Sequence, residues 1–210
     1  MHALLQSVYD EVINGNRSAV EAGVRAAMDA GQPVASILND ALIAAMKEVG
    51  DRFEREEFYV PEMLIAARAM QAGLAVLKPH LAQAGVVMGG TVVIGTVQGD
   101  LHDIGKNLVA MMLEGAGFEI VDLGTDVGPE KFVAAVREHH PSLVGMSALL
   151  TTTMKNMQSC IQAIEDLGLR SQVKILVGGA PVTEAFATSI GADGYAPDAS
   201  RAVALAKSFG

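Results

Sequence analysis

An aspartate and a histidine two residues apart are the chemically most suggestive pair in this sequence. They lie in one polar segment that reads Gly99, Asp100, Leu101, His102, Asp103, Ile104, Gly105, Lys106, Asn107. On a loop, the Asp100 carboxylate can turn toward the His102 imidazole and accept the proton of one ring nitrogen. The other nitrogen then keeps a lone pair that points outward, as in most metal-bound histidines. The pair therefore predicts a metal ligand, although a helix-capping loop without metal explains this segment alone equally well.

The elements around this loop follow a regular order from residue 91 onward. Short apolar runs, which predict strands, cover residues 91–97, 119–123, 143–147 and 174–177, with a weaker run at 194–196. Amphipathic segments, which predict helices, cover residues 104–116, 129–139, 153–167, 182–190 and 199–208. This alternation predicts an α/β unit with a flavodoxin-like, doubly wound parallel sheet of five strands. Ligands of such sheets bind beyond the carboxyl ends of the strands, and the Asp100–His102 loop follows the first strand. Gly105 is expected to let the chain turn tightly into the next helix.

The residues before this unit have a different pattern. Apolar residues recur there at three- and four-residue spacing, which predicts four helices forming an N-terminal bundle. Gly15 with Asn16, Gly31 with Pro33, and Pro61 supply the breaks, with Pro61 in the first turn of the fourth helix. The spacing of apolar residues changes in the segment 85–90, from a helical pattern to alternating strands and helices. The expected domains are therefore residues 1–88 and 89–210.

Composition excludes several functions. With 24 acidic and 15 basic side chains, the formal charge of −9 argues against a nucleic-acid partner. No stretch reaches 18 uninterrupted apolar residues, so no membrane span is expected. Polar and charged residues such as Asp10, Glu11 and Arg17 interrupt the first thirty positions, so no signal peptide is expected and the protein is predicted to be cytoplasmic. A single cysteine, Cys160, expected to be half-buried on a helix, cannot build a thiolate cluster. A metal must therefore use other ligands or arrive inside a cofactor.

Two further segments follow the third and fourth predicted strands. The first reads Ser147, Ala148, Leu149, Leu150, Thr151, Thr152, Thr153, and the second contains Gly178 and Gly179. Together with the first loop they form the pattern D-x-H-x-x-G, S-x-L and G-G. In this pattern the sequence closely resembles the cobalamin-binding domain of methionine synthase and of the corrinoid proteins of methyltransferase systems.

This resemblance implies a cobalamin or related cobamide as cofactor, with His102 as the lower axial ligand of cobalt in place of the cofactor's own tail base. Asp100 would be the partner of His102, and Thr153 stands where the family often has a serine that contacts this aspartate. Gly178 and Gly179 would let the nucleotide tail pass close to the backbone, and Ser147 could hydrogen-bond within the slot. The remaining cofactor-lining positions that the resemblance implies are Gly99, Leu101, Asp103, Gly105, Leu149, Thr151 and Ala199.

The helical part resembles the cap domain of the same proteins in segments 50–53, 58–62 and 66–70. The resemblance places Phe53 and Val60, and with them Met63, where they would shield the upper face of the corrin from water and oxidants. The alternative is that these residues belong to the core of the four-helix bundle.

For function, the resemblance implies a corrinoid methyl carrier. A donor-specific methyltransferase would methylate cobalt(I), a second methyltransferase would pass the methyl group to tetrahydrofolate or coenzyme M, and a reductive activator would be a third partner. A B12-dependent regulator and an adenosylcobalamin mutase subunit are the alternatives. The sequence leaves open the donor (methanol, a methylamine, a methoxylated aromatic or a betaine), the acceptor, the tail base of the cobamide and the oligomeric state.

Overall fold

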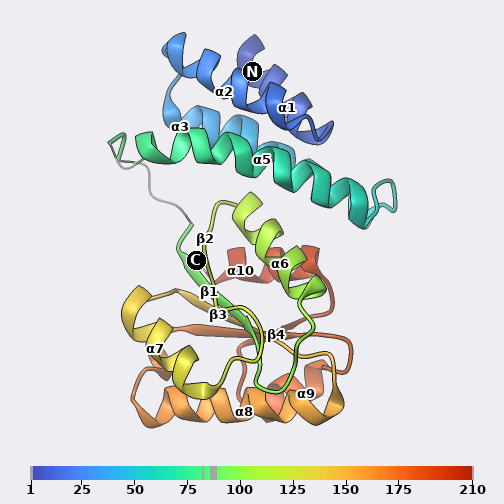
Figure 1. Cartoon of the computed structure of the whole chain (residues 1–210), viewed down its shortest axis with the longest axis vertical. Coiled ribbons are helices and arrows are strands. Elements are labelled where there is room, and N and C mark those ends of the chain that lie inside the picture. The colour runs from blue at the N-terminus through green and yellow to red at the C-terminus, as the bar shows by residue number, and fades with distance from the viewer. Residues whose placement is uncertain (1, 82, 86–88, 210) are drawn as a thin grey trace. The chain divides into compact units, whose positions relative to one another are not determined.

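The computed structural model describes residues 2–81, 83–85 and 89–209 and divides into two compact units (Figure 1). One unit comprises Met1–Met88 with Glu114–Gly117, and the other comprises Gly89–Leu113 with Phe118–Gly210. Residues 86–88, which belong to the segment expected to separate the domains, lie outside the described residues.

The described part of the first unit, residues 2–81, is built from helices. They are α1 (Ala3–Ile13), α2 (Arg17–Asp29), α3 (Val34–Ser36), η1 (Ile37–Ile43), α4 (Ala44–Glu54) and α5 (Val60–Leu81). Because α3, η1 and α4 follow one another without a break, they form one continuous helix. Residues 2–81 therefore contain the four helices that the periodicity predicts. The Asn16 side chain accepts a hydrogen bond from the Ala19 N–H and so caps α2.

The middle of the third of these helices, η1, is a π-helical segment, which the sequence pattern did not predict. In η1 each turn contains more residues than in an α-helix, so residues five apart in sequence share a face. Ile37 and Leu42 have this spacing, and both side chains are fully buried. The π-helical segment therefore keeps the apolar face of this helix turned toward the core.

Helix α5 is the central element of the helical unit. Pro61 lies in its first turn, as predicted. A Cβ atom at Gly73 would lie 2.7 Å from Val20 Cγ1 and 3.0 Å from Leu42 Cδ2, so the missing side chain permits close helix packing. By length and hydropathy α5 also meets the criteria for a membrane span, with Val60–Leu81 at a mean hydropathy of 1.3. However, half of this apolar segment is buried inside the protein, and the core helices of soluble proteins meet the same criteria.

The second unit is the predicted α/β domain. Its strands are β1 (Thr91–Thr96), β2 (Glu119–Asp122), β3 (Leu143–Ser147), β4 (Lys174–Gly178) and β5 (Gly194–Ala196). Its helices are α6 (Ile104–Gly115), α7 (Pro129–His139), α8 (Thr151–Asp166), η2 (Arg170–Gln172), α9 (Glu184–Ser189) and α10 (Ala199–Ser208). All strand pairs are parallel and the order is β2-β1-β3-β4-β5, the flavodoxin-like order. Figure 1 shows α6 and α10 on one face of the sheet and α7 and α8 on the other.

The core beneath the sheet joins the strands to α7 and α8. Phe132 of α7 and Met157 and Ile164 of α8 are fully buried against strand residues such as Val144. Cys160 belongs to this cluster and is fully buried, so the expectation of a half-buried cysteine is wrong. Burial, followed by the charge of Glu130, raises the pKa of its thiol to about 12.

The starts of two helices differ by two residues from the sequence expectation. Helix α8 begins at Thr151, two residues earlier than predicted, because the Leu150 carbonyl accepts the first helical hydrogen bonds. Helix α9 begins at Glu184, two residues later than predicted, because the Thr183 side chain caps it by accepting from the Phe186 N–H.

Strand register brings the predicted motifs together. Thr96 of β1 pairs with Ser147 of β3, Ser147 pairs with Gly178 of β4, and Gly178 pairs with Ala196 of β5. All of these residues lie at the carboxyl ends of their strands. The chain leaves β1 toward β2 on one side, whereas β3 lies on the other side, so the loops after β1 and β3 meet at the switch point where such sheets bind ligands.

Candidate functional site

His102 and Asp100 form the predicted pair at the carboxyl end of β1. The Asp100 carboxylate oxygen Oδ1 lies 2.7 Å from His102 Nδ1 and 3.1 Å from the backbone nitrogen of His102. An ionised carboxylate can only accept, so Nδ1 carries the proton. In the neutral imidazole Nε2 then keeps its lone pair. Asp100 is completely buried, whereas the His102 side chain is 51% exposed, so the ring reaches solvent while its partner is fixed.

The second carboxylate oxygen of Asp100 is held by the loop after β3 and the start of α8. Oδ2 accepts hydrogen bonds from the Thr153 hydroxyl at 2.7 Å, the Leu149 N–H at 2.8 Å and the Leu150 N–H at 3.3 Å. Burial alone would raise the pKa of Asp100, but the hydrogen bonds from Thr153, Leu149 and His102 outweigh it and hold the pKa well below its usual range. Asp100 therefore stays ionised at neutral pH and remains an acceptor for the histidine.

The backbone of the histidine loop is fixed as well. The buried Thr96 hydroxyl donates to the His102 carbonyl oxygen at 2.9 Å, and the Asn156 side chain of α8 donates to the Gln98 carbonyl oxygen at 2.7 Å. His102 is thus held at its ring, its N–H and its carbonyl group. Such preorganisation is what a ligand needs if it is to present one nitrogen to a metal.

Exposed apolar side chains flank the histidine. Leu101 is 73% exposed and Ile104 is 81% exposed. Leu149 and Leu150, whose N–H groups bind Asp100, are also exposed. Large apolar side chains gathered at a ligand-binding edge indicate a broad apolar ligand surface. Sequence reasoning missed Ile104 and Leu150, although apolar residues inside an otherwise polar loop were a usable signal.

The two glycines at the end of β4, Gly178 and Gly179, are required by the protein's own backbone. A Cβ atom at Gly179, whose φ is +123°, would lie 1.9 Å from the Ala148 carbonyl oxygen. A Cβ atom at Gly178 would lie 2.9 Å from the Ala196 carbonyl oxygen. Gly179 therefore allows the loops after β3 and β4 to approach each other, and Gly178 allows the end of β4 to lie close to the end of β5. Sequence reasoning had attributed both glycines only to the passage of a ligand.

Gly105 does not form the tight turn that the sequence suggested. It lies in the first turn of α6 without a positive φ, so the expectation that it permits a tight turn is wrong. A Cβ atom at this position would meet nothing within 4 Å. Glycine at this position leaves open space beside the histidine loop, as a ligand would require.

A buried hydroxyl near β5 has no partner in the part of the chain that the structure describes. Ser200 is 8% exposed, and its Oγ has no hydrogen-bond partner among the described residues. It follows the buried Ala199 at the start of α10, which Asp198 caps by accepting from the Arg201 N–H. Sequence reasoning named Ala199 but not Ser200. A buried polar atom without a partner is costly unless a ligand satisfies it.

The remaining predicted residues are spread over the chain. Asp103 accepts from the Asn107 side chain and stabilises the entry to α6, and Thr151 is an exposed first residue of α8. In the helical unit, Phe53 is half-buried, Val60 is 38% exposed and Met63 is fully buried. Met63 therefore lies in the protein core, whereas Val60 has an exposed side chain.

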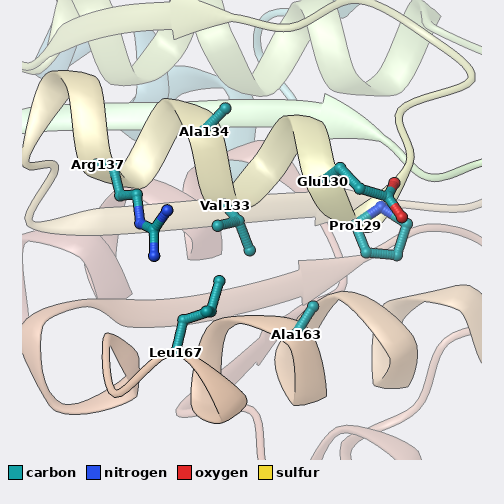
Figure 2. Close-up of a pocket in the computed structure, with 7 residues that line it drawn as sticks. All are labelled: Pro129, Glu130, Val133, Ala134, Arg137, Ala163 and Leu167. Atoms are coloured by element: carbon teal, nitrogen blue, oxygen red, sulfur yellow. The ribbon is translucent and has the colours of Figure 1, made fainter.

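A shallow apolar groove of about 320 Å³ lies elsewhere in the α/β unit, between α7 and α8. Figure 2 shows its lining residues, which are Pro129, Glu130, Val133, Ala134, Arg137, Ala163 and Leu167. None of them belongs to the histidine site.

The donor set suits a metal that is already chelated. Across residues 2–81, 83–85 and 89–209, no group of three or more His, Cys, Asp or Glu side chains could hold a metal ion. One oriented histidine among apolar side chains can supply only an axial ligand, which is sufficient for a metal in a macrocycle. The open space at Gly105, and a Ser200 hydroxyl without a partner among the described residues, are compatible with such a cofactor.

Comparisons with known proteins agree with this chemistry. Residues 90–204 match a B12 binding domain family, and residues 4–78 match a second B12 binding domain family. Dimethylamine corrinoid protein 2 of Methanosarcina mazei is 45% identical over 205 residues, covering 97% of this chain and 95% of that protein.

Two solved structures share the fold. A chain of the methanol:cobalamin methyltransferase complex from Methanosarcina barkeri has a TM-score of 0.90 and 30% identity, over 99% of this chain and 79% of that chain. A cobalamin-binding protein from Desulfitobacterium hafniense has a TM-score of 0.79 and 31% identity, over 98% of each chain.

Proposed function

Since this chain belongs to the B12-binding corrinoid proteins, we propose that it is the methyl-carrying subunit of a methyltransferase system. Its cofactor is a cobalamin or a related corrinoid. When bound, this cofactor supplies a cobalt centre that takes up a methyl group and releases it to an acceptor. The chain's own residues bind the cofactor, present an axial nitrogen and limit access of water.

One observation carries this proposal: the buried, ionised Asp100 orients the half-exposed ring of His102 by a hydrogen bond of 2.7 Å. We infer that His102 Nε2 is the lower axial ligand. Asp100, held by Thr153 and by the loop after β3, increases the basicity of the ring and sets its direction.

The other cofactor contacts are proposed from their position around this pair. The exposed Leu101, Leu149 and Ile104 would contact the apolar edge of the corrin. The slot for the nucleotide tail would run past Ser147, Gly178 and Gly179, which lie at neighbouring strand ends, toward the hydroxyl of Ser200. The lining positions Gly99, Asp103, Gly105, Thr151 and Ala199 complete the proposed set.

We propose a methylated amine as the methyl donor. The dimethylamine corrinoid protein matches at 45% identity over 205 residues, whereas the chain from the methanol complex matches at 30%. The proposed partners are a donor-specific methyltransferase, a second methyltransferase with tetrahydrofolate or coenzyme M as acceptor, and a reductive activator, all in the cytoplasm. Incubating holoprotein and its donor-specific methyltransferase with dimethylamine, trimethylamine or methanol, and following cofactor methylation by absorbance, tests the donor. Methylation by methanol alone would exclude the amine.

We propose that residues 1–88 cap the cofactor bound to residues 89–210 and that Phe53 and Val60 shield its upper face; Met63, fully buried, would support them from the core. With methylcobalamin bound, Phe53→Ala should speed photolysis, because a loosened cage lets the radical pair separate. Val60→Ala should have a smaller effect, because it removes less side chain. An unchanged photolysis rate in both variants would mean that these residues serve only the bundle.

The axial assignment is tested by electron paramagnetic resonance of the cobalt(II) holoprotein with ¹⁵N-labelled histidine. Wild type should show coupling to one histidine nitrogen. His102→Ala should keep part of its cofactor through ring and tail contacts yet lose this coupling. Absence of the coupling in wild type would exclude His102 as the ligand, whereas its persistence in His102→Ala would assign it to another histidine.

A further inference from the structure

The loop between β2 and α7 runs alongside the end of β1 and the histidine loop. The Thr96 N–H donates to the Gly124 carbonyl oxygen at 3.0 Å, and the Val127 N–H donates to the Thr96 carbonyl oxygen at 2.9 Å. Val97 and Val127 form an isolated parallel bridge. Pairing thus continues past the end of both strands and brings residue 126 beside residues 99 and 100.

Asp126 binds two consecutive residues of the histidine loop. Its carboxylate Oδ1 accepts a hydrogen bond of 2.7 Å from the Gly99 N–H, and its own N–H donates a hydrogen bond of 3.0 Å to the Asp100 carbonyl oxygen. The first bond joins a charged acceptor to a neutral donor, which makes it stronger than an ordinary amide hydrogen bond. Asp126 therefore fixes the backbone on the amino-terminal side of Asp100 and at Asp100 itself.

The backbone conformation of Asp126 supports a dedicated role. Its φ is +55°, in the left-handed region that few residues other than glycine adopt. Aspartate and asparagine tolerate this region better than most residues. Such strain persists where surrounding contacts impose it, and it is concentrated at functional sites. In Asp126 this conformation directs the side chain and the N–H to neighbouring residues of one loop.

A continuous set of contacts leads from Asp126 to the imidazole. Asp126 holds the backbone of Asp100, and the Asp100 carboxylate holds the N–H and the Nδ1 of His102. We propose that Asp126 is a positioning residue for the axial ligand: it keeps the Asp100–His102 pair in the geometry in which Nε2 is offered to cobalt. This inference rests on the proposed function, because it assumes that His102 coordinates the metal.

Two substitutions separate the side-chain bond from the backbone conformation. Asp126→Gly removes the acceptor of the Gly99 N–H but adopts a positive φ without strain and keeps the backbone N–H. Asp126→Asn keeps an acceptor oxygen and tolerates the same φ, but it is uncharged. His140→Gly is the matched control, because His140 also has a positive φ, of 45°, but it is the C-cap of α7 and precedes β3.

The first measurement is the fraction of cobalt(II) holoprotein with histidine coupling in the paramagnetic resonance spectrum. The equilibrium constant for histidine coordination should fall by about tenfold in Asp126→Gly, the size expected for loss of a hydrogen bond to a charged group. Asp126→Asn should be intermediate and His140→Gly should match wild type. The proposal would be overturned if all three variants showed the same fraction of histidine coupling as wild type. It would also be overturned if His140→Gly lost as much histidine coupling as Asp126→Gly.

The second measurement uses the apoprotein and needs no cofactor. Hydrogen exchange of the Gly99 amide should accelerate by about tenfold in Asp126→Gly and less in Asp126→Asn, because its acceptor is removed or weakened. If Asp126→Gly does not fold, acceleration in Asp126→Asn but not in His140→Gly still supports the proposal, and no acceleration overturns it. Missing histidine coupling in wild type would instead refute the axial assignment, so the two failures are distinguishable.

Discussion

The hydroxyl of Thr153 donates a hydrogen bond of 2.7 Å to Asp100 Oδ2, and both side chains are buried. The same hydroxyl oxygen lies 3.0 Å from the Leu150 carbonyl oxygen, one turn earlier in the chain. A single threonine at the start of α8 thus stabilises the carboxylate that orients His102. This contact joins the segment after the third predicted strand to the Asp100–His102 loop.

Replacing Thr153 by valine should weaken the fold and the site together. Thr153→Val keeps the shape of the side chain but leaves one buried carboxylate oxygen with fewer donors, at a cost of about 1–3 kcal/mol in the free energy of unfolding. Thr153→Ser keeps the hydroxyl and should recover most of that loss. Urea unfolding of the three apoproteins measures the difference. Equal stability of the valine and serine variants would mean that the hydroxyl contributes nothing to Asp100.

Acid should weaken the folded apoprotein through Asp100. The pKa of Asp100 is lower in the folded protein than in the unfolded chain, where aspartate has a value of about 3.9. Its contribution to stability is therefore complete above the unfolded value and is lost as the pH falls below it toward the folded pKa. The stability advantage of wild type over Asp100→Asn should shrink as the pH is lowered from 6 to 3. Unfolding curves at each pH measure it, and a constant difference would contradict the prediction.

The fold was predictable from the sequence because the local hydrophobic patterns of the strands and helices agree with the parallel sheet that they form. Repeated strand and helix patterns predicted all five strands, including the weak one at Gly194–Ala196, and their parallel arrangement in one sheet. The π-helical segment at Ile37–Ile43 was not predictable from a 3.6-residue period, because it replaces that period locally.

Site residues were predictable where a side chain acts through its own chemistry. The spacing of Asp100 and His102 predicted their hydrogen bond, and the resemblance predicted the contact from Thr153. Asp126 and Ser200 were missed because their importance depends on partners distant in sequence, or on the lack of a partner. Such features emerge only from the tertiary fold.

Gly179 should not tolerate a side chain. In Gly179→Ala the new Cβ would lie 1.9 Å from the Ala148 carbonyl oxygen at a φ of +123°, so the loops after β3 and β4 must separate. Gly191→Ala is the control, because Gly191 also has a positive φ, of 77°, but a Cβ there would meet nothing within 4 Å. Backbone strain costs about 1–3 kcal/mol in either variant. Gly179→Ala should lose clearly more stability in urea, and equal losses would show that the loop can move without cost.

Removing the hydroxyl of Ser200 should weaken cofactor binding without lowering the stability of the apoprotein. In the apoprotein the buried Oγ has no partner among the described residues, so Ser200→Ala removes an unsatisfied polar atom and should leave the free energy of unfolding unchanged or raise it by up to about 1 kcal/mol. If Oγ bonds the bound cofactor, the same variant should bind cobalamin about fivefold to tenfold more weakly, which corresponds to one lost hydrogen bond.

Ser208→Ala serves as the control for Ser200→Ala, because the Ser208 hydroxyl lies in the same helix but already donates to the Leu205 carbonyl oxygen at 2.7 Å. This control should bind cobalamin like wild type. Titration of each apoprotein with cobalamin, followed by absorbance, gives the affinities, and urea unfolding gives the stabilities. A Ser200→Ala variant that binds cobalamin as tightly as wild type would show that the hydroxyl faces no ligand. Weaker binding with unchanged stability would assign Ser200 to the cofactor slot.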